Sequence, residues 1–168
     1  INGVRSIKTP SACILTWEYL FPLVKIPKAV EYLGKYDIWD LDYDILSFQY
    51  GMRLFNLDIN DEEMWGKLFK QRSSLFNEIM EKGSIAYEAT IIDYNNYANS
   101  HAFVVDFEGY KCIAINRGQI NSLAFNSVFE PGIHKIMIAY VRNQHGWRVS
   151  LYSEKEDNID CSVIAKKY

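Results

Sequence analysis

The stretch HAFVVDFEGYKCIAIN (residues 101–116) decides the fold class of the second half of this chain. Two short apolar runs lie on either side of the polar EGY segment, and they have the length and β-branched content of strands joined by a turn. Two further runs, HKIMIAYVR (134–142) and WRVSLYS (147–153), are separated by a QHG turn signal. The pattern predicts a small sheet, to which the apolar run SIAYEATIID (84–93) adds another strand.

The first half has helical rather than strand periodicity. TPSACILTWEYLFP (9–22) predicts a short helix that ends before Pro22, because proline cannot continue a helix. IPKAVEYLGKY (26–36) predicts a second helix, with Gly34 as its stop. Apolar residues spaced four and seven apart predict a third helix over 60–83, which would end at Gly83.

Taken together, the sequence predicts an α/β protein with an α+β arrangement in its C-terminal half. Helices come first, and a small mixed sheet with flanking helices follows. INSLAFNS (120–127) predicts a short helix, and a last helix begins after Asn158 or Asp160, either of which can cap it.

Composition and charge exclude several classes of protein. The net charge of −3 excludes a generally basic surface, so any contact with a nucleotide requires a local patch. Three cysteines lie far apart without the spacing of a zinc ribbon or a redox motif. No apolar run approaches the roughly 20 residues of a membrane span. These features predict a cytoplasmic protein that does not enter a membrane.

The acidic segment YDIWDLDYD (36–44) is the first candidate site. Its spacing resembles a calcium-binding loop, but Ile45 stands where that loop needs glycine and Gly51 where it needs a bidentate glutamate. Two interpretations remain open at this point. The carboxylates cap helices and face solvent, or one of them binds a hard metal ion.

Arginine and small polar residues form the second candidate site, because they fall in or near the ends of the predicted strands. Converging guanidinium, amide and hydroxyl groups can hold a phosphodiester backbone. The alternative is an ordinary polar rim. The residues are Arg117, Arg142, Arg148, Asn116, Asn121, Ser150 and Ser153.

Three stretches together resemble the DHH phosphoesterase superfamily, in particular its oligoribonuclease-like and exopolyphosphatase-related members. They are SACILTWEYLFP (11–22), PKAVEYLGKYDIWD (27–40) and WRVSLYSEKEDNIDCSVIAKKY (147–168). In such proteins a DHH domain carries Asp and His ligands for two manganese ions. A linker then leads to a smaller substrate-binding domain.

The resemblance implies a domain organisation for this chain. Residues 1–45 would be the C-terminal part of the DHH catalytic domain, 46–83 a helical linker and 84–168 the DHH-associated substrate-binding domain. In the family, the pattern resembling CSVIAKKY runs into a glycine-rich segment. We therefore expect the chain to be an incomplete piece of the enzyme, inactive by itself because it lacks the D-H-H motif.

The resemblance also assigns site residues. Asp37 matches a metal-binding and catalytic aspartate, with Asp40 as the alternative if the spacing slips. The family often has an arginine between two serines of a strand, where this chain has Tyr152. Arg148 would compensate, because it lies on the same strand face as Ser150 by alternation. The further substrate-binding candidates are Asn116, Asn121 and Ser153.

The implied activity is manganese-dependent hydrolysis of phosphodiester or phosphomonoester bonds in short oligonucleotides or small nucleotides. Two manganese ions would be the cofactors and the nucleotide the partner, with a homodimer as one oligomeric state that the sequence allows. Two alternatives stay open. One is an inorganic polyphosphatase, which the same family includes. The other is a non-catalytic module that binds single-stranded nucleic acid through arginine and stacked aromatic rings.

Overall fold

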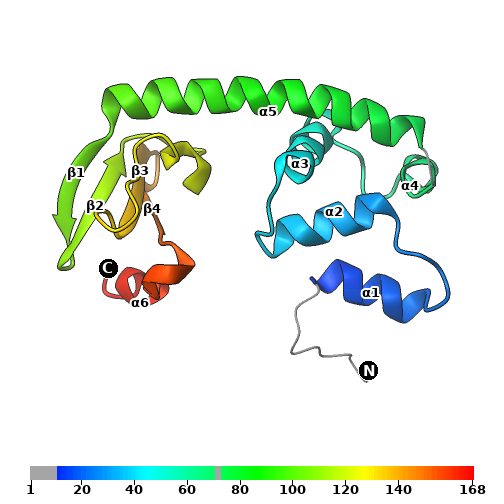
Figure 1. Cartoon of the computed structure of the whole chain (residues 1–168), viewed down its shortest axis with the longest axis horizontal. Helices are drawn as coiled ribbons and strands as arrows, with labels where there is room; N and C mark the ends of the chain where they lie inside the picture. The colour runs from blue at the N-terminus through cyan, green and yellow to red at the C-terminus, as the bar shows by residue number, and fades with distance from the viewer. Residues whose placement is uncertain (1–10, 71–72) are drawn as a thin grey trace. The chain divides into compact units, whose positions relative to one another are not determined.

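The computed structural model describes residues 11–70 and 73–168 (Figure 1). It contains two compact units, of which the first ends at Ala89 and the second begins at Thr90. Both units draw on one long helix, α5 (Ser74–His101). Within the described ranges, no helix is both long enough and apolar enough to cross a membrane.

The first unit is helical, with bounds as follows: α1 (Ala12–Leu20), α2 (Lys28–Asp37), α3 (Tyr43–Phe55), α4 (Glu62–Leu68) and the N-terminal part of α5. Aspartates set two of these starts, since Asp42 accepts a hydrogen bond from the Ile45 N–H at 2.8 Å and Asp61 caps α4 in the same way. The predicted helices at 9–22 and 26–36 are confirmed as α1 and α2, except that residues 9–10 lie outside the described ranges. Helix α3 was not recognised as a separate element in the sequence.

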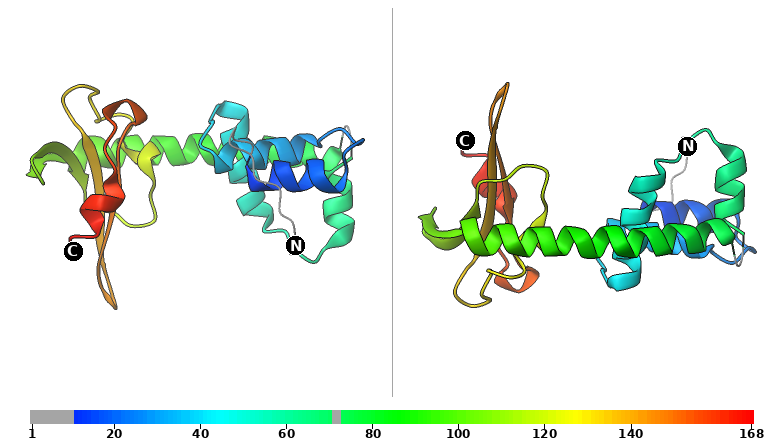
Figure 2. Two further views of the ribbon diagram at one scale, coloured as in Figure 1. Left: turned by 90° about the horizontal axis from the view of Figure 1, so that it is seen from below. Right: turned by 90° about the horizontal axis from the view of Figure 1, so that it is seen from above.

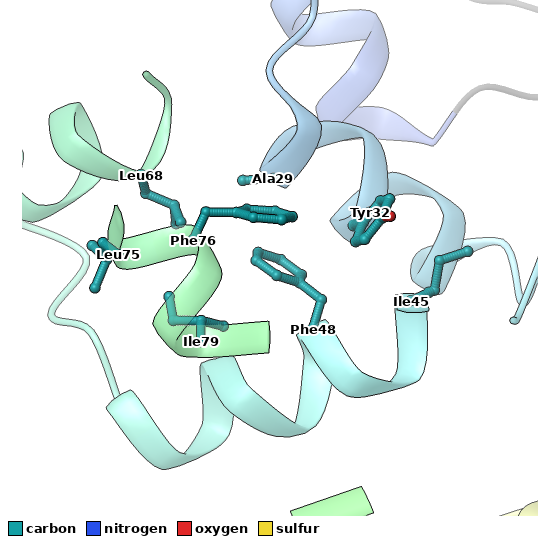
Figure 3. Close-up of a cluster of buried hydrophobic side chains, with 8 residues drawn as sticks. All are labelled: Ala29, Tyr32, Ile45, Phe48, Leu68, Leu75, Phe76 and Ile79. Carbon is teal, nitrogen blue, oxygen red and sulfur yellow. The ribbon is translucent and has the colours of Figure 1, made fainter. Parts of the chain in front are cut away.

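An aromatic cluster forms the core of the first unit (Figure 3). The rings of Phe48 and Phe76 stack with their centroids 5.2 Å apart, and Tyr32 meets Phe48 edge-on at 5.7 Å. Aliphatic side chains from α2 to α5 surround the rings: Ala29, Ile45, Leu68, Leu75 and Ile79. These helices therefore share one core.

Two predicted helix ends are wrong, and both errors concern glycine. Gly34 lies inside α2 and Gly83 inside α5. Each lets another helix approach closely, because an added Cβ on Gly34 would lie 2.4 Å from Ile14 Cδ1 and one on Gly83 would lie 1.9 Å from the Ser47 carbonyl oxygen. These glycines serve helix packing rather than helix termination.

The predicted third helix and the strand that followed it are also corrected. The helix predicted over 60–83 is two helices, since α4 ends at Leu68 and α5 begins at Ser74. Residues 84–93 continue α5 and form no strand. Tyr94 and Ala98 are buried four residues apart, which is the spacing of a helix face.

The second unit contains a four-stranded mixed sheet in the order β1-β2-β3-β4. Its strands are β1 (Phe103–Phe107), β2 (Tyr110–Ile115), β3 (Ile136–Asn143) and β4 (Gly146–Tyr152). β2 and β3 are parallel, while the two outer pairs are antiparallel. The short helices η1 (Ser122–Phe125), η2 (Lys155–Asp157) and α6 (Cys161–Ala165) complete the unit, so the predicted fold class is confirmed.

Both faces of this sheet are covered in part. Side chains of one face pack against α5 and η1, and the buried set is Tyr94, Ala98, Ile113, Ile115, Ala124, Phe125, Met137 and Ala139. On the other face, Cys112, Ala114, Ile136 and Ile138 pack against Ile164 of α6. The sheet thus divides the unit into two layers of core (Figure 1).

Candidate functional site

A small polar pocket lies at the carboxyl end of β2, where its parallel pairing with β3 ends. The carboxyl ends of parallel strands meet at one edge of a sheet, and ligands of α/β proteins often bind there. The chain leaves β2 at Ile115 and forms a loop over 116–121, which lines the pocket together with β3 and β4. The cavity has a volume of about 70 Å³, room for one compact polar group.

Strand β4 brings two of the predicted residues together in this pocket. Arg148 pairs with Val141 and Ser150 with Ala139 in the β3–β4 register. Ala139 is buried in the core beneath α5, so Arg148 and Ser150 lie on that same face of the sheet. The predicted alternation is confirmed, and both residues line the pocket.

Arg117 supplies a second guanidinium from the loop after β2. Its Nη2 donates to Asp93 Oδ2 of α5 at 2.5 Å, and the guanidinium lies over the ring of Tyr97 at 4.8 Å from the centroid. The Arg117 side chain is only 27% exposed. Helix α5 therefore holds this cation in place before any ligand arrives.

Two tyrosine hydroxyls fix the loop itself. Tyr97 Oη donates to the carbonyl of Asn116 at 2.7 Å, and Tyr152 Oη donates to the carbonyl of Ile120 at 3.1 Å. The two bonds hold both ends of the segment that carries Arg117. The Tyr152 side chain thus positions the pocket loop.

Three predicted substrate-binding residues do not line the pocket. The backbone carbonyl of Asn116 accepts the Tyr97 bond, and Asn121 Oδ1 caps η1 by accepting from the Leu123 N–H at 3.1 Å. Ser153 Oγ donates to the carbonyl of Ile159 at 2.9 Å. These contacts give the three residues local structural roles beside the pocket.

The sequence did not indicate that Gln119 lines the pocket. It indicated Arg117 only as one of several arginines near strand ends. Both line the pocket because β3 returns parallel to β2. A crossover between parallel strands is not visible in the apolar runs, which read equally well as a series of hairpins. The only available signal was a polar loop that directly follows a buried strand.

The acidic segment in the first unit does not form a metal site by itself. Asp37 is the exposed last residue of α2, and Asp40 is exposed just beyond it. Asp42 caps α3, and Asp44 accepts a hydrogen bond from Tyr32 Oη at 3.2 Å. Across residues 11–70 and 73–168, no group of three or more His, Cys, Asp or Glu is arranged to hold a metal ion. The described residues therefore do not by themselves form a two-manganese centre, and we derive no catalytic step through one.

Comparisons with known proteins add no assignment. No protein-family model matches the chain, and neither the curated proteins nor the solved structures include a significant match. Functional interpretation therefore rests on the residues and their geometry.

Proposed function

We propose that this chain is part of a DHH-type phosphoesterase, and that its second unit binds a phosphate group of a short oligonucleotide or nucleotide. The observation that supports this most directly is the convergence of Arg117, Arg148 and Ser150 in one polar pocket. The three come from two different segments. Two guanidinium groups and a hydroxyl are a donor set suited to phosphate oxygens.

The charge distribution favours the same ligand. The chain has a net charge of −3, so its surface as a whole does not attract polyanions. The pocket is a local exception, with two arginines around about 70 Å³ of space. A phosphate ligand would share Arg117 with Asp93, while Arg148 is exposed and has its donors available to the ligand.

The catalytic part of the proposal rests on the resemblance alone. In the intact enzyme, bound manganese ions would supply the Lewis-acid chemistry of phosphoester hydrolysis. Asp37 is the residue of this chain that we assign to one of these ions. Since the chain contains no D-H-H motif, we expect it to bind substrate without hydrolysing it.

A pair of arginine variants tests the pocket. We expect Arg148→Ala to weaken the binding of a labelled dinucleotide by about tenfold to a hundredfold, because hydrogen bonds to a charged group are worth about 1.5–3 kcal/mol. The matched control is Arg142→Ala. Arg142 is also exposed on the β3–β4 hairpin, but it pairs with Trp147 on the opposite face of the sheet. Fluorescence anisotropy at fixed salt measures both affinities.

The control decides between specific and general binding. If both variants lose the same amount of dinucleotide affinity, the hairpin attracts nucleotides only by charge, as a single-strand-binding module would. That result would contradict specific binding in the pocket. Inorganic polyphosphate serves as competitor. If it displaces the dinucleotide and itself binds more tightly, the phosphate pocket stands and the substrate class becomes polyphosphate.

A further inference from the structure

Strand β4 forms an open edge of the sheet. Among the strands that the structure describes, β4 pairs with β3 alone. Figure 2 shows the β3–β4 hairpin projecting from the rest of the second unit. Natural edge strands usually carry proline, lysine or inward-pointing charges that block pairing with another chain. GWRVSLY contains no proline or lysine, and Arg148 is its single charged residue.

An apolar row follows this open edge. Trp147, Val149 and Leu151 alternate along β4 and line a groove of about 520 Å³ on the α6 face of the sheet. Trp147 is 65% exposed and Val149 56% exposed. The groove continues across β3 through Tyr140, whose ring centroid lies 6.1 Å from that of Trp147. Such an exposed apolar strand is typical of a protein interface.

The residue pattern of β4 is self-complementary in one antiparallel register. Val149 is the middle residue of Gly146–Tyr152, so a two-fold axis at Val149 pairs every residue of the strand with one on the second copy. Trp147 then faces Leu151 in the apolar row, and Arg148 faces Ser150 on the other face. No like charges stand directly opposite each other.

Neighbouring registers are less favourable. An axis at Arg148 places two guanidinium groups directly opposite each other, which is destabilising. An axis at Ser150 still pairs Val149 with Leu151, but it places Trp147 opposite Ser153, beyond the end of β4, so the largest side chain of the apolar row loses its apolar partner. Charge and apolar pattern therefore select the register centred on Val149.

We propose that a second copy of this chain pairs antiparallel along β4, with the two-fold axis at Val149, and joins the two sheets into one. The interface is isologous, since the same strand serves both copies. It would set Arg148 of each copy beside the partner's Ser150, on the face that carries the polar pocket. The inference stands on the edge strand and does not depend on the proposed phosphoesterase activity.

Two valines of equal exposure test the interface. Val149 and Val163 are both 56% exposed, but Val163 lies on α6 and not on the strand edge. Sedimentation equilibrium of the 168-residue chain should show a dimer, with Val149→Asp weakening it by at least about tenfold because two carboxylates would meet at the axis. Val163→Asp should leave the dimer unchanged. A wild-type chain that stays monomeric, or a dimer that survives Val149→Asp, would overturn the proposal.

Cysteine cross-linking tests the register independently, in a chain whose Cys13 and Cys161 are replaced by serine. Facing residues of antiparallel strands have Cα atoms about 4.5–5.5 Å apart, which a disulfide can span. Val149→Cys should therefore form a covalent dimer on mild oxidation. The two copies of Trp147→Cys would lie about 14 Å apart and should remain unlinked. Circular dichroism confirms that each variant is folded, and cross-linking through Trp147→Cys would refute the register.

Discussion

At the scale of single residues, two glycines bring α3 and α5 into backbone contact. A Cβ on Gly83 would lie 1.9 Å from the Ser47 carbonyl oxygen, and one on Gly51 would lie 2.1 Å from the Ile79 carbonyl oxygen. Both of these oxygens belong to the backbone and not to a flexible side chain. Backbone would have to move to admit even a methyl group at either position.

Gly83→Ala is expected to destabilise the first unit by about 1–3 kcal/mol, the usual cost of overpacking a well-packed contact. The matched control is Gly66→Ala in α4, where an added Cβ meets nothing within 4 Å. It should stabilise the same unit by about 0.5–1 kcal/mol, because alanine is the better helix former. Urea unfolding followed by tryptophan fluorescence measures both, since Trp17, Trp39 and Trp65 belong to the first unit. A Gly83→Ala variant as stable as Gly66→Ala would contradict the close contact.

The helix ends predicted at Gly34 and Gly83 were wrong because that prediction used residue type alone. Glycine ends helices often, and nothing in the local sequence of Gly34 or Gly83 reveals that another helix lies against it. By contrast, the cap residues Asp42, Asp61 and Asp160 act within two or three positions along the chain. For that reason the sequence narrowed the cap of the last helix to Asn158 or Asp160, and the structure shows Asp160.

At the scale of elements, the 116–121 loop is the part of the site that depends on tertiary contacts. Its two ends are held by the hydroxyls of Tyr97 on α5 and Tyr152 on β4. The four strands, in contrast, follow from alternating apolar runs and turn residues and were all predicted. The strand expected at 84–93 was wrong because a short apolar run fits a helix face equally well.

Removing either tyrosine hydroxyl should loosen the loop and weaken phosphate binding. For Tyr97→Phe and Tyr152→Phe we expect about fivefold lower dinucleotide affinity, since a hydrogen bond contributes about 1 kcal/mol. Hydrogen exchange should quicken at the amides of 116–121. Tyr110→Phe, on the opposite face of the sheet, serves as control and should change neither quantity. Unchanged exchange in both loop variants would show that the hydroxyls do not position the loop.

At the scale of the whole molecule, the two units have cores with no residue in common. The aromatic cluster around Phe48 and Phe76 belongs to the first unit, while Ile113, Ile115 and Phe125 belong to the second. Composition already indicated a helical part followed by a sheet. The sequence could not predict which side chains share a core, because core membership depends on contacts between helices that are far apart in the sequence.

A cavity made in one core should therefore destabilise mainly that unit. Phe48→Ala removes a ring that is 1% exposed and should cost the first unit about 3–5 kcal/mol. The amides of β2 and β3 should keep their protection. Hydrogen exchange with mass spectrometry reports both units in one experiment, and Ile115→Ala provides the reciprocal case. Equal loss of protection in both units would show that they unfold as one.

Binding of a phosphate group at the carboxyl end of β2, where its pairing with β3 ends, is tested most directly by ¹⁵N NMR titration of the chain with a dinucleotide. We predict saturable shifts at the amides of Arg117, Gly118, Arg148 and Ser150, which line the pocket. Trp147 and Val149, whose side chains lie on the opposite face, should respond less. Shifts centred on the apolar groove instead, or no saturable shifts at all, would contradict the account.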